Sequence, residues 1–208
     1  MKKAVFVLLF LCAGPAISDG DMLERILGGA EQSPVTRAKF EQTKYMSSLK
    51  RPLVLSGRLT FSRRDGILWI IDKPYRMTYI LSESRIVEIG SDGTARARGQ
   101  SDLPGLTQIS RVFRAMLAAD SNALKDYFDV KDINENAGVW EIMLIPRQAQ
   151  LAQFISGMRL SGARFVDAIE IGETNGDRST IRFIGAQGDA APNLEEQKFF
   201  HGEFSEKP

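Results

Sequence analysis

Few side chains in this chain are of a type that could carry out covalent or metal chemistry. The sequence has one histidine, His201, and one cysteine, Cys12. His201 lies in a polar C-terminal stretch beside Phe199 and Phe200, which favours a solvated residue over a catalytic base. Zinc and non-haem iron sites are built from several histidines, cysteines or carboxylates held together. We therefore predict no metal site and no cofactor.

The arrangements that activate a nucleophile are also missing. The sequence contains no G-x-S-x-G elbow and no recognisable set of base and orienting residue. The segments Ser91-Asp92-Gly93 and Asn175-Gly176-Asp177 are typical of turns and not of phosphate cradles, because no helix follows them directly. We expect six aspartates to be mostly turn and cap residues, namely Asp72, Asp92, Asp120, Asp129, Asp132 and Asp167. We expect no catalytic residues and no enzyme activity.

The N-terminus has the three parts of a secretory signal peptide. Lys2 and Lys3 form its basic start, and Ala4 to Ala13 is an apolar stretch too short to span a bilayer as a helix. Small residues suited to cleavage follow at Gly14-Pro15-Ala16 or at Ala16-Ile17-Ser18, and the sequence leaves both sites open. The pattern predicts export to a bacterial periplasm, with no second long apolar run to hold the mature protein in a membrane.

Cleavage would remove Cys12 with the signal. Lipid attachment at this cysteine is not expected, because a large residue, Leu11, precedes it. A mature chain without cysteine has no disulfides and no thiol nucleophile, so its stability must come from a hydrophobic core. The remaining charge is close to neutral, which removes the electrostatic basis for nucleic-acid binding.

Alternating apolar and polar residues predict several short antiparallel strands behind the signal. One parity of these strands carries large apolar and aromatic side chains, and the stretch Ile67 to Ile71 is apolar on both parities. We predict that this parity lines an apolar cavity, although the same residues would also suit an ordinary core. The candidate cavity residues of the strands are Phe40, Leu59, Phe61, Ile67, Trp69, Ile71, Met77, Tyr79 and Leu81. Arg63 falls on the same parity and needs a partner there.

Helical spacing appears in two places. Asp21 to Gly29 predicts a short N-terminal helix, and Leu106 to Ala119 predicts a central helix whose apolar side carries Ile109, Phe113 and Met116. Between the strands and this second helix, the polar stretch from Thr94 to Gly105 is typical of a loop. A helical turn is expected within residues 120–128, and either a turn of helix or a bulged strand within 148–154.

More strands are expected within residues 139–145, 158–160, 165–171 and 180–184, the last two joined by a hairpin at Asn175-Gly176. After Gly185 the composition predicts a loosely held polar segment. We divide the chain into a signal peptide (1–18), one main domain (19–190) and a polar C-terminal tail (191–208). The fold class is mainly β (α+β), a strongly curved antiparallel sheet that either closes as a barrel or stays open with the two helices over its concave apolar face.

Several short motifs resemble the LolA-like family of periplasmic lipoprotein carriers, over roughly residues 20 to 185. Phe40-Glu41-Gln42 is similar to a motif near the first strand of the family, and Ser56-Gly57-Arg58-Leu59 is similar to the opening of one of its strands. The basic Arg63, six positions after Gly57, also matches the family. Trp69, the strand end Leu144-Ile145-Pro146, and Gly176 with Thr180 to Phe183 add to the likeness. The chain departs from the family at Arg63-Arg64-Asp65-Gly66 and at Thr94-Ala95-Arg96-Ala97, which indicates a divergent branch.

The resemblance implies an unclosed half-barrel with helices as a lid over a cavity. That cavity would take acyl chains of a lipoprotein or other lipid cargo from an inner-membrane exporter and pass them to an outer-membrane acceptor. It also implies that Arg63 is a lid latch, hydrogen-bonded to backbone groups of the lid when the cavity is empty. We expect a monomeric, non-enzymatic carrier. Two alternatives stay open, namely a periplasmic lipid-binding sensor that regulates a membrane partner and an enzyme acting on lipids or polysaccharide precursors.

Overall fold

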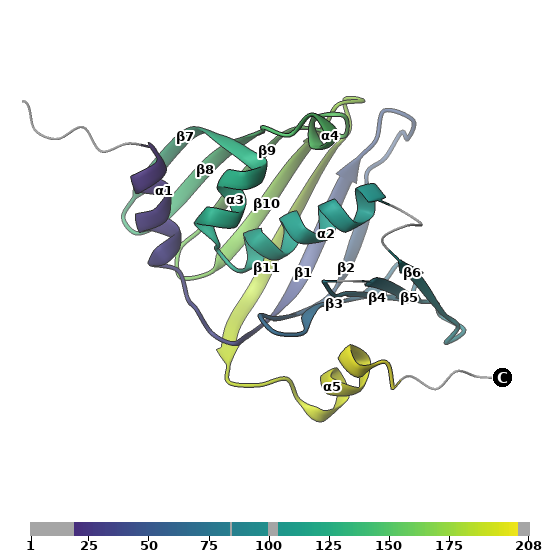
Figure 1. The fold of residues 1–208 in the computed structure, drawn as a ribbon. Helices are drawn as coiled ribbons and strands as arrows, with labels where there is room; N and C mark the ends of the chain where they lie inside the picture. Colours follow the sequence, from purple (N-terminus) through teal and green to yellow (C-terminus); the bar gives the residue numbers. More distant parts are fainter. Residues whose placement is uncertain (1–18, 84, 100–103, 204–208) are drawn as a thin grey trace, which may run out of the picture.

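The computed structural model describes residues 19–83, 85–99 and 104–203 of the 208-residue chain. Its main feature is one eleven-stranded antiparallel sheet with the strand order β6-β5-β4-β3-β2-β1-β11-β10-β9-β8-β7 (Figure 1). The two outermost strands do not pair with each other, so the sheet stays open as predicted. The predicted signal peptide lies outside the described residues.

The first half of the sheet is a meander that runs from the centre to one edge. Its strands are β1 (Val35–Tyr45), β2 (Leu53–Ser62), β3 (Gly66–Lys73), β4 (Met77–Leu81), β5 (Arg85–Ile89) and β6 (Ala95–Gly99). A second meander returns from the other edge and ends beside β1. Its strands are β7 (Phe128–Asn136), β8 (Val139–Pro146), β9 (Ile155–Gly162), β10 (Val166–Glu173) and β11 (Arg178–Asp189).

Helices cover both faces of the sheet. The concave face packs against α1 (Asp19–Gly28), α2 (Pro104–Leu117) and α3 (Ser121–Tyr127), which share one core with it (Figure 1). The short α4 (Ala149–Ala152) joins β8 to β9, and α5 (Leu194–His201) lies against the outer face. Both predicted helices on the concave face are confirmed. The turn within 120–128 is α3, where the Asp120 carboxylate caps the helix by accepting the Ala123 N–H.

The strand β3 is buried on both faces, as its sequence predicts. Ile67, Trp69 and Ile71 belong to the concave core, while Leu68 and Ile70 belong to a second apolar cluster on the outer face. The outer cluster needs a cover, and the side chains of Phe199 and Phe200 in α5 supply it. The expectation of a loosely held segment after Gly185 is therefore wrong. Strand β11 runs on to Asp189, and α5 docks on the apolar outer surface.

Two strands are missing from the sequence prediction, and they are the two edges of the sheet. The stretch expected as a loop from Thr94 to Gly105 contains β6, and β7 follows α3 directly. Edge strands face solvent along one side and carry charged residues, so their apolar alternation is weak. Strand β6 alternates alanine with arginine, and a register shift between Val130 and Asp132 interrupts the alternation of β7.

The α5 helix is fastened to the sheet by a partly buried charge network. The Arg37 guanidinium of β1 donates two hydrogen bonds to the Glu196 carboxylate, at 2.7 and 2.6 Å. The Thr60 hydroxyl of β2 donates a third at 2.7 Å, and the Asn193 backbone N–H a fourth at 2.8 Å. Burial alone would raise the pKa of Glu196, but these donors outweigh it and lower the pKa below its usual range.

Close approach of β2 and β3 generates a first prediction. A Cβ on Gly57 would stand 1.9 Å from the carbonyl oxygen of Ile70 and 3.0 Å from the Cα of Ile71. We expect Gly57→Ala to lower the free energy of unfolding by about 1–3 kcal/mol or more, because the two strands must separate. Urea denaturation measures this. Gly28→Ala is the control, since its Cβ would meet nothing within 4 Å. Equal effects of the two changes would contradict the prediction.

The Glu196 network generates a second prediction, on pH. A carboxyl whose pKa is lowered by folding stabilises the protein above its unfolded pKa, and this contribution is lost as the pH falls through the folded pKa. Glu196→Gln should cost about 1.5–3 kcal/mol at neutral pH. The difference from the wild type should shrink below about pH 4. Thermal unfolding across this pH range measures it. Glu195→Gln makes the same charge change at an exposed neighbour and should cost little at either pH.

Candidate functional site

The centre of the concave face is an aromatic cluster around Trp69 of β3. The Trp69 ring lies 3.9 Å from the Phe40 ring of β1, centroid to centroid, and 6.4 Å from the Phe183 ring of β11. Its third aromatic neighbour, Phe113, comes from α2 at 5.5 Å in an edge-to-face arrangement. Trp69 therefore joins three strands of the sheet to the helix above them.

The structure brings most of the predicted cavity residues together. Those from β1, β2 and β3 are buried in one core, and those from β4 are half-buried at its edge. The buried group is Phe40, Leu59, Phe61, Ile67, Trp69 and Ile71, and the half-buried group is Met77, Tyr79 and Leu81. On α2, Met116 is buried and Phe113 half-buried against the same core. The side chain of Ile109 lies outside the described part of the chain.

The helix α2 fills the concave face in this conformation. Besides Met116, its side chains Val112 and Ala115 are buried in the core. A small gap beside the core, lined among others by Leu117 and Phe183, has a volume of only about 20 Å³. Because side chains of α2 pack directly on Trp69 and its core, a ligand of the size of an acyl chain would have to displace α2 to reach the aromatic cluster.

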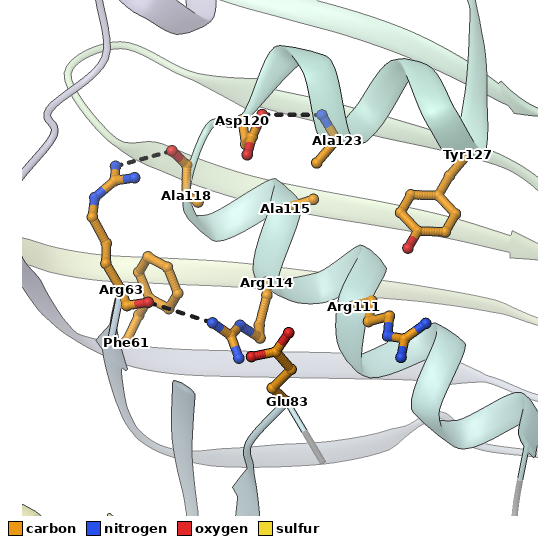
Figure 2. A pocket seen from close by; sticks show the side chains of 10 residues that line it. All are labelled: Phe61, Arg63, Glu83, Arg111, Arg114, Ala115, Ala118, Asp120, Ala123 and Tyr127. Carbon is orange, nitrogen blue, oxygen red and sulfur yellow. Dashed lines mark hydrogen bonds between the residues drawn. The ribbon is translucent and has the colours of Figure 1, made fainter. Parts of the chain in front are cut away.

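Arg63 lies where the sheet, α2 and the N-terminal segment meet. It follows β2 directly, and its guanidinium donates to the carbonyl oxygen of Ala118, just past the end of α2, at 3.0 Å (Figure 2). The same guanidinium donates to the Ser33 carbonyl oxygen at 3.2 Å and to the Gln32 side-chain amide oxygen. One half-buried cation thus holds three backbone and side-chain acceptors from two segments that flank the concave core.

A solvent-accessible pocket of about 330 Å³ opens beside this arginine (Figure 2). Phe61, Ala115 and Ala118 give it an apolar side, and Arg111 and Arg114 of α2 together with Glu83 give it a charged one. The Arg114 guanidinium donates to the backbone carbonyl oxygen of Arg63 at 3.4 Å, a second polar link between α2 and the end of β2. Sequence reasoning missed both α2 arginines. Their spacing of three residues on the polar side of a predicted helix was the available signal.

The described residues contain no group of three or more His, Cys, Asp or Glu side chains placed to hold a metal ion. His201 is exposed in the last turn of α5. Within the same part of the chain, no helix is both long enough and apolar enough to cross a bilayer.

Comparison with known proteins identifies the family. A sequence model described as outer membrane lipoprotein carrier protein LolA-like matches residues 13–201, which is most of the chain. The chain belongs to this LolA-like family. The match includes α5 and both edge strands, so these elements lie within the family's domain. No curated protein has a sequence significantly similar to this chain.

Solved structures share the fold at very low sequence identity. A LolA superfamily protein from Nitrosomonas europaea is 7% identical, with a TM-score of 0.50 over 88% of this chain and 98% of that one. A DUF1329 family protein from Desulfovibrio piger is 10% identical, with a TM-score of 0.50 over 91% of this chain and 99% of that one. These proteins therefore share the half-barrel although nearly all of their side chains differ. For this LolA-like chain, the site must be inferred from its own residues.

The position of Arg63 generates a third prediction. Arg63→Leu removes the hydrogen bond to Ala118, so the last turn of α2 and its link to α3 should open more often. We expect backbone amides of residues 118–120 to lose about tenfold or more of their protection against hydrogen exchange. Mass spectrometry of peptic fragments measures this. Arg64→Leu is a matched control, because the Arg64 side chain is 77% exposed and pairs only with its neighbour Asp65 among the described residues. Equal protection in the two variants would contradict a latch.

Proposed function

We propose that this protein is a periplasmic carrier that holds the acyl chains of a lipoprotein or another lipid between the concave face of its sheet and α2. The observation that carries the proposal is the interface between them. It is apolar and aromatic at its centre, yet it is fastened at one end by Arg63 hydrogen bonds to backbone oxygens. Such an interface has the chemistry of an acyl-binding site and a polar fastening that can be released without breaking the sheet.

The physical need for a carrier follows from the cost of hydrating acyl chains. Each methylene left in water costs about 0.8 kcal/mol, so a chain of about fifteen methylenes costs on the order of 12 kcal/mol. Free passage through an aqueous compartment is negligible at that cost. A protein that covers the chain with its own apolar face removes most of this cost for as long as the cargo is bound.

Release requires that binding is not too tight. When the site is empty, α2 takes the place of cargo against Trp69, and Arg63 stabilises this closed state through Ala118 and Ser33. Cargo can bind only if these contacts break, and the free energy needed to break them lowers the net affinity for cargo. In this proposal Arg63 is the lid latch, and the closed helix competes with cargo for the same apolar surface.

The family and the N-terminal sequence support the cellular setting of the proposal. The family is described as outer membrane lipoprotein carrier protein LolA-like. For this chain we propose a route from an inner-membrane donor to an outer-membrane acceptor. The signal-like segment at residues 1–18 would direct the chain to the periplasm. We propose that the protein works as a monomer and makes transient contact with donor and acceptor. No catalytic step is part of this function.

A binding experiment on the mature protein tests the proposal and gives a fourth prediction. Native mass spectrometry of protein purified from its own periplasm should show a bound lipid or acylated peptide that organic extraction removes. For the extracted protein, Arg63→Leu should raise the affinity for a fluorescent fatty acid about 10- to 100-fold and slow its release, because the closed state loses charge-assisted hydrogen bonds. The control Arg64→Leu should bind like the wild type. A mass without ligand, together with no uptake of the fatty acid, would overturn the carrier proposal.

A further inference from the structure

Large apolar side chains gather on the surface at one end of the strands. Six of them are between 39% and 54% exposed, namely Tyr45, Leu49, Val54, Tyr75, Ile145 and Phe154. They lie in or next to the β1–β2, β3–β4 and β8–β9 connections. In an antiparallel sheet with this strand order, these connections all lie at the same end, beside the β10–β11 hairpin. We call this end the hairpin rim. The β1–β2 hairpin, the β10–β11 hairpin and α4 lie together at the top of Figure 1.

Cations without partners stand among these apolar side chains. Lys50 and Arg51 follow Leu49 in the β1–β2 hairpin, and Lys73 and Arg76 flank Tyr75 in the β3–β4 turn. All four are exposed, and none of their side chains forms an ion pair or hydrogen bond with another described residue.

The acidic residues of the rim are already engaged. Glu173 accepts a hydrogen bond from the Lys44 ammonium at 2.6 Å, and Asp177 accepts one from the Ser47 backbone N–H at 2.9 Å. Asp72 pairs with the Arg58 guanidinium at 3.4 Å. Asp177, and Asp92 in the β5–β6 turn at the same end, accept hydrogen bonds only from uncharged donors and keep their charge. The four cations without partners outnumber these two carboxylates, so the rim has an excess of positive charge, although the chain as a whole has a formal net charge of only +1.

This combination fits the surface of a bilayer better than it fits bulk water. Aromatic and aliphatic side chains enter the boundary between headgroups and acyl chains, and lysine and arginine beside them interact with lipid phosphates. Each cation near an anionic bilayer contributes about 1 kcal/mol of attraction, so four of them give a substantial preference for anionic lipid. Loop tips such as Leu49 and Phe154 can enter the boundary without any change to the sheet.

We propose that the hairpin rim docks the protein reversibly on membrane surfaces that contain anionic phospholipids. The proposal does not depend on what the concave face carries. Its geometry also sets an orientation. Gln108 of α2 and Gln148, just before α4, are hydrogen-bonded at 2.6 Å near the rim, whereas Arg63 follows β2 at the opposite end. The docked protein therefore turns the first half of α2 toward the membrane and the Arg63 end away from it.

Vesicle binding of the mature full-length protein tests the docking and is the fifth prediction. Wild-type protein should float with vesicles of phosphatidylcholine and phosphatidylglycerol in equal parts, and much less with vesicles of phosphatidylcholine alone. High salt should weaken the binding, because it screens exposed charges. Lys50→Gln with Arg51→Gln should reduce binding to the anionic vesicles by about 10- to 30-fold. Leu49→Ser with Phe154→Ser should reduce binding to both kinds of vesicle.

Matched control variants test whether vesicle binding depends on the rim itself, and not on exposed apolar or charged side chains anywhere on the protein. Val139→Ser removes a 57% exposed apolar side chain at the opposite end of the sheet, and Arg64→Gln removes an exposed cation there. Both controls should bind vesicles like the wild type, and all variants should keep the wild-type melting temperature. The proposal is overturned if the wild type binds neither kind of vesicle, or if the controls lose as much binding as the rim variants. Concentration-dependent self-association that only the rim variants abolish, without vesicle binding, would assign the rim to a second copy of the chain instead.

Discussion

Trp69 packs against Phe40 and Phe183 of the sheet and against Phe113 of α2, and the arrangement of the whole half-barrel depends on this contact. An open, strongly curved sheet exposes a wide concave face, and here that face is apolar. Burial of such a surface is the main force that folds the protein, so the chain must cover it even without a ligand. It does so with the crossover between the two meanders, since α2 and α3 connect β6 to β7.

The cover and the sheet are held together in two different ways. At the centre, the contact between α2 and the sheet is apolar and does not depend on direction, so other apolar groups can replace it. At the end of α2 the contact is polar and depends on direction, with Arg63 donating to the Ala118 carbonyl oxygen. The outer face repeats the scheme with α5, where Phe199 and Phe200 supply the apolar contact and Glu196 the polar one. The outer contact is bidentate and charged at both partners. It therefore holds α5 more firmly than Arg63 holds α2, and in the proposed function α2 is the cover that cargo replaces.

The central strands of the sheet could be predicted from the sequence, whereas the two edge strands and the C-terminal helix were not predicted. Strand β3 has a neighbour on each side and is buried on both faces, so it appears in the sequence as the continuous apolar stretch Ile67 to Ile71. The edge strands β6 and β7 carry arginines, aspartates and a bulge that protect an open edge, and this protection hides them from pattern analysis. Two features of the sequence could have predicted the helix α5. Asn193 and Glu196 form a capping box, and the outer residues Leu68 and Ile70 had no predicted cover.

The candidate site, too, could be predicted from the sequence only in part. The sequence could assign the large apolar residues and Arg63 to one face, because residues of these types contradict a solvent-exposed strand face. Arg111 and Arg114 were not singled out, because arginine on the polar side of a helix needs no explanation until a pocket is seen beneath it. The sequence also could not show that α2 fills the concave face, because cavity volume depends on how closely two elements approach.

The pairing of β1 with β11 has a consequence for how the chain folds. These central strands come from opposite ends of the domain, with Phe40 opposite Phe183, while every other neighbouring pair is joined by a short connection. Such non-local pairing is slow to form, because a long loop must close before the contact is made. Each meander can assemble locally, but the curved sheet with one continuous core exists only once the last strand has arrived. A chain delivered from its N-terminus therefore stays without its central seam until almost all of it has been delivered.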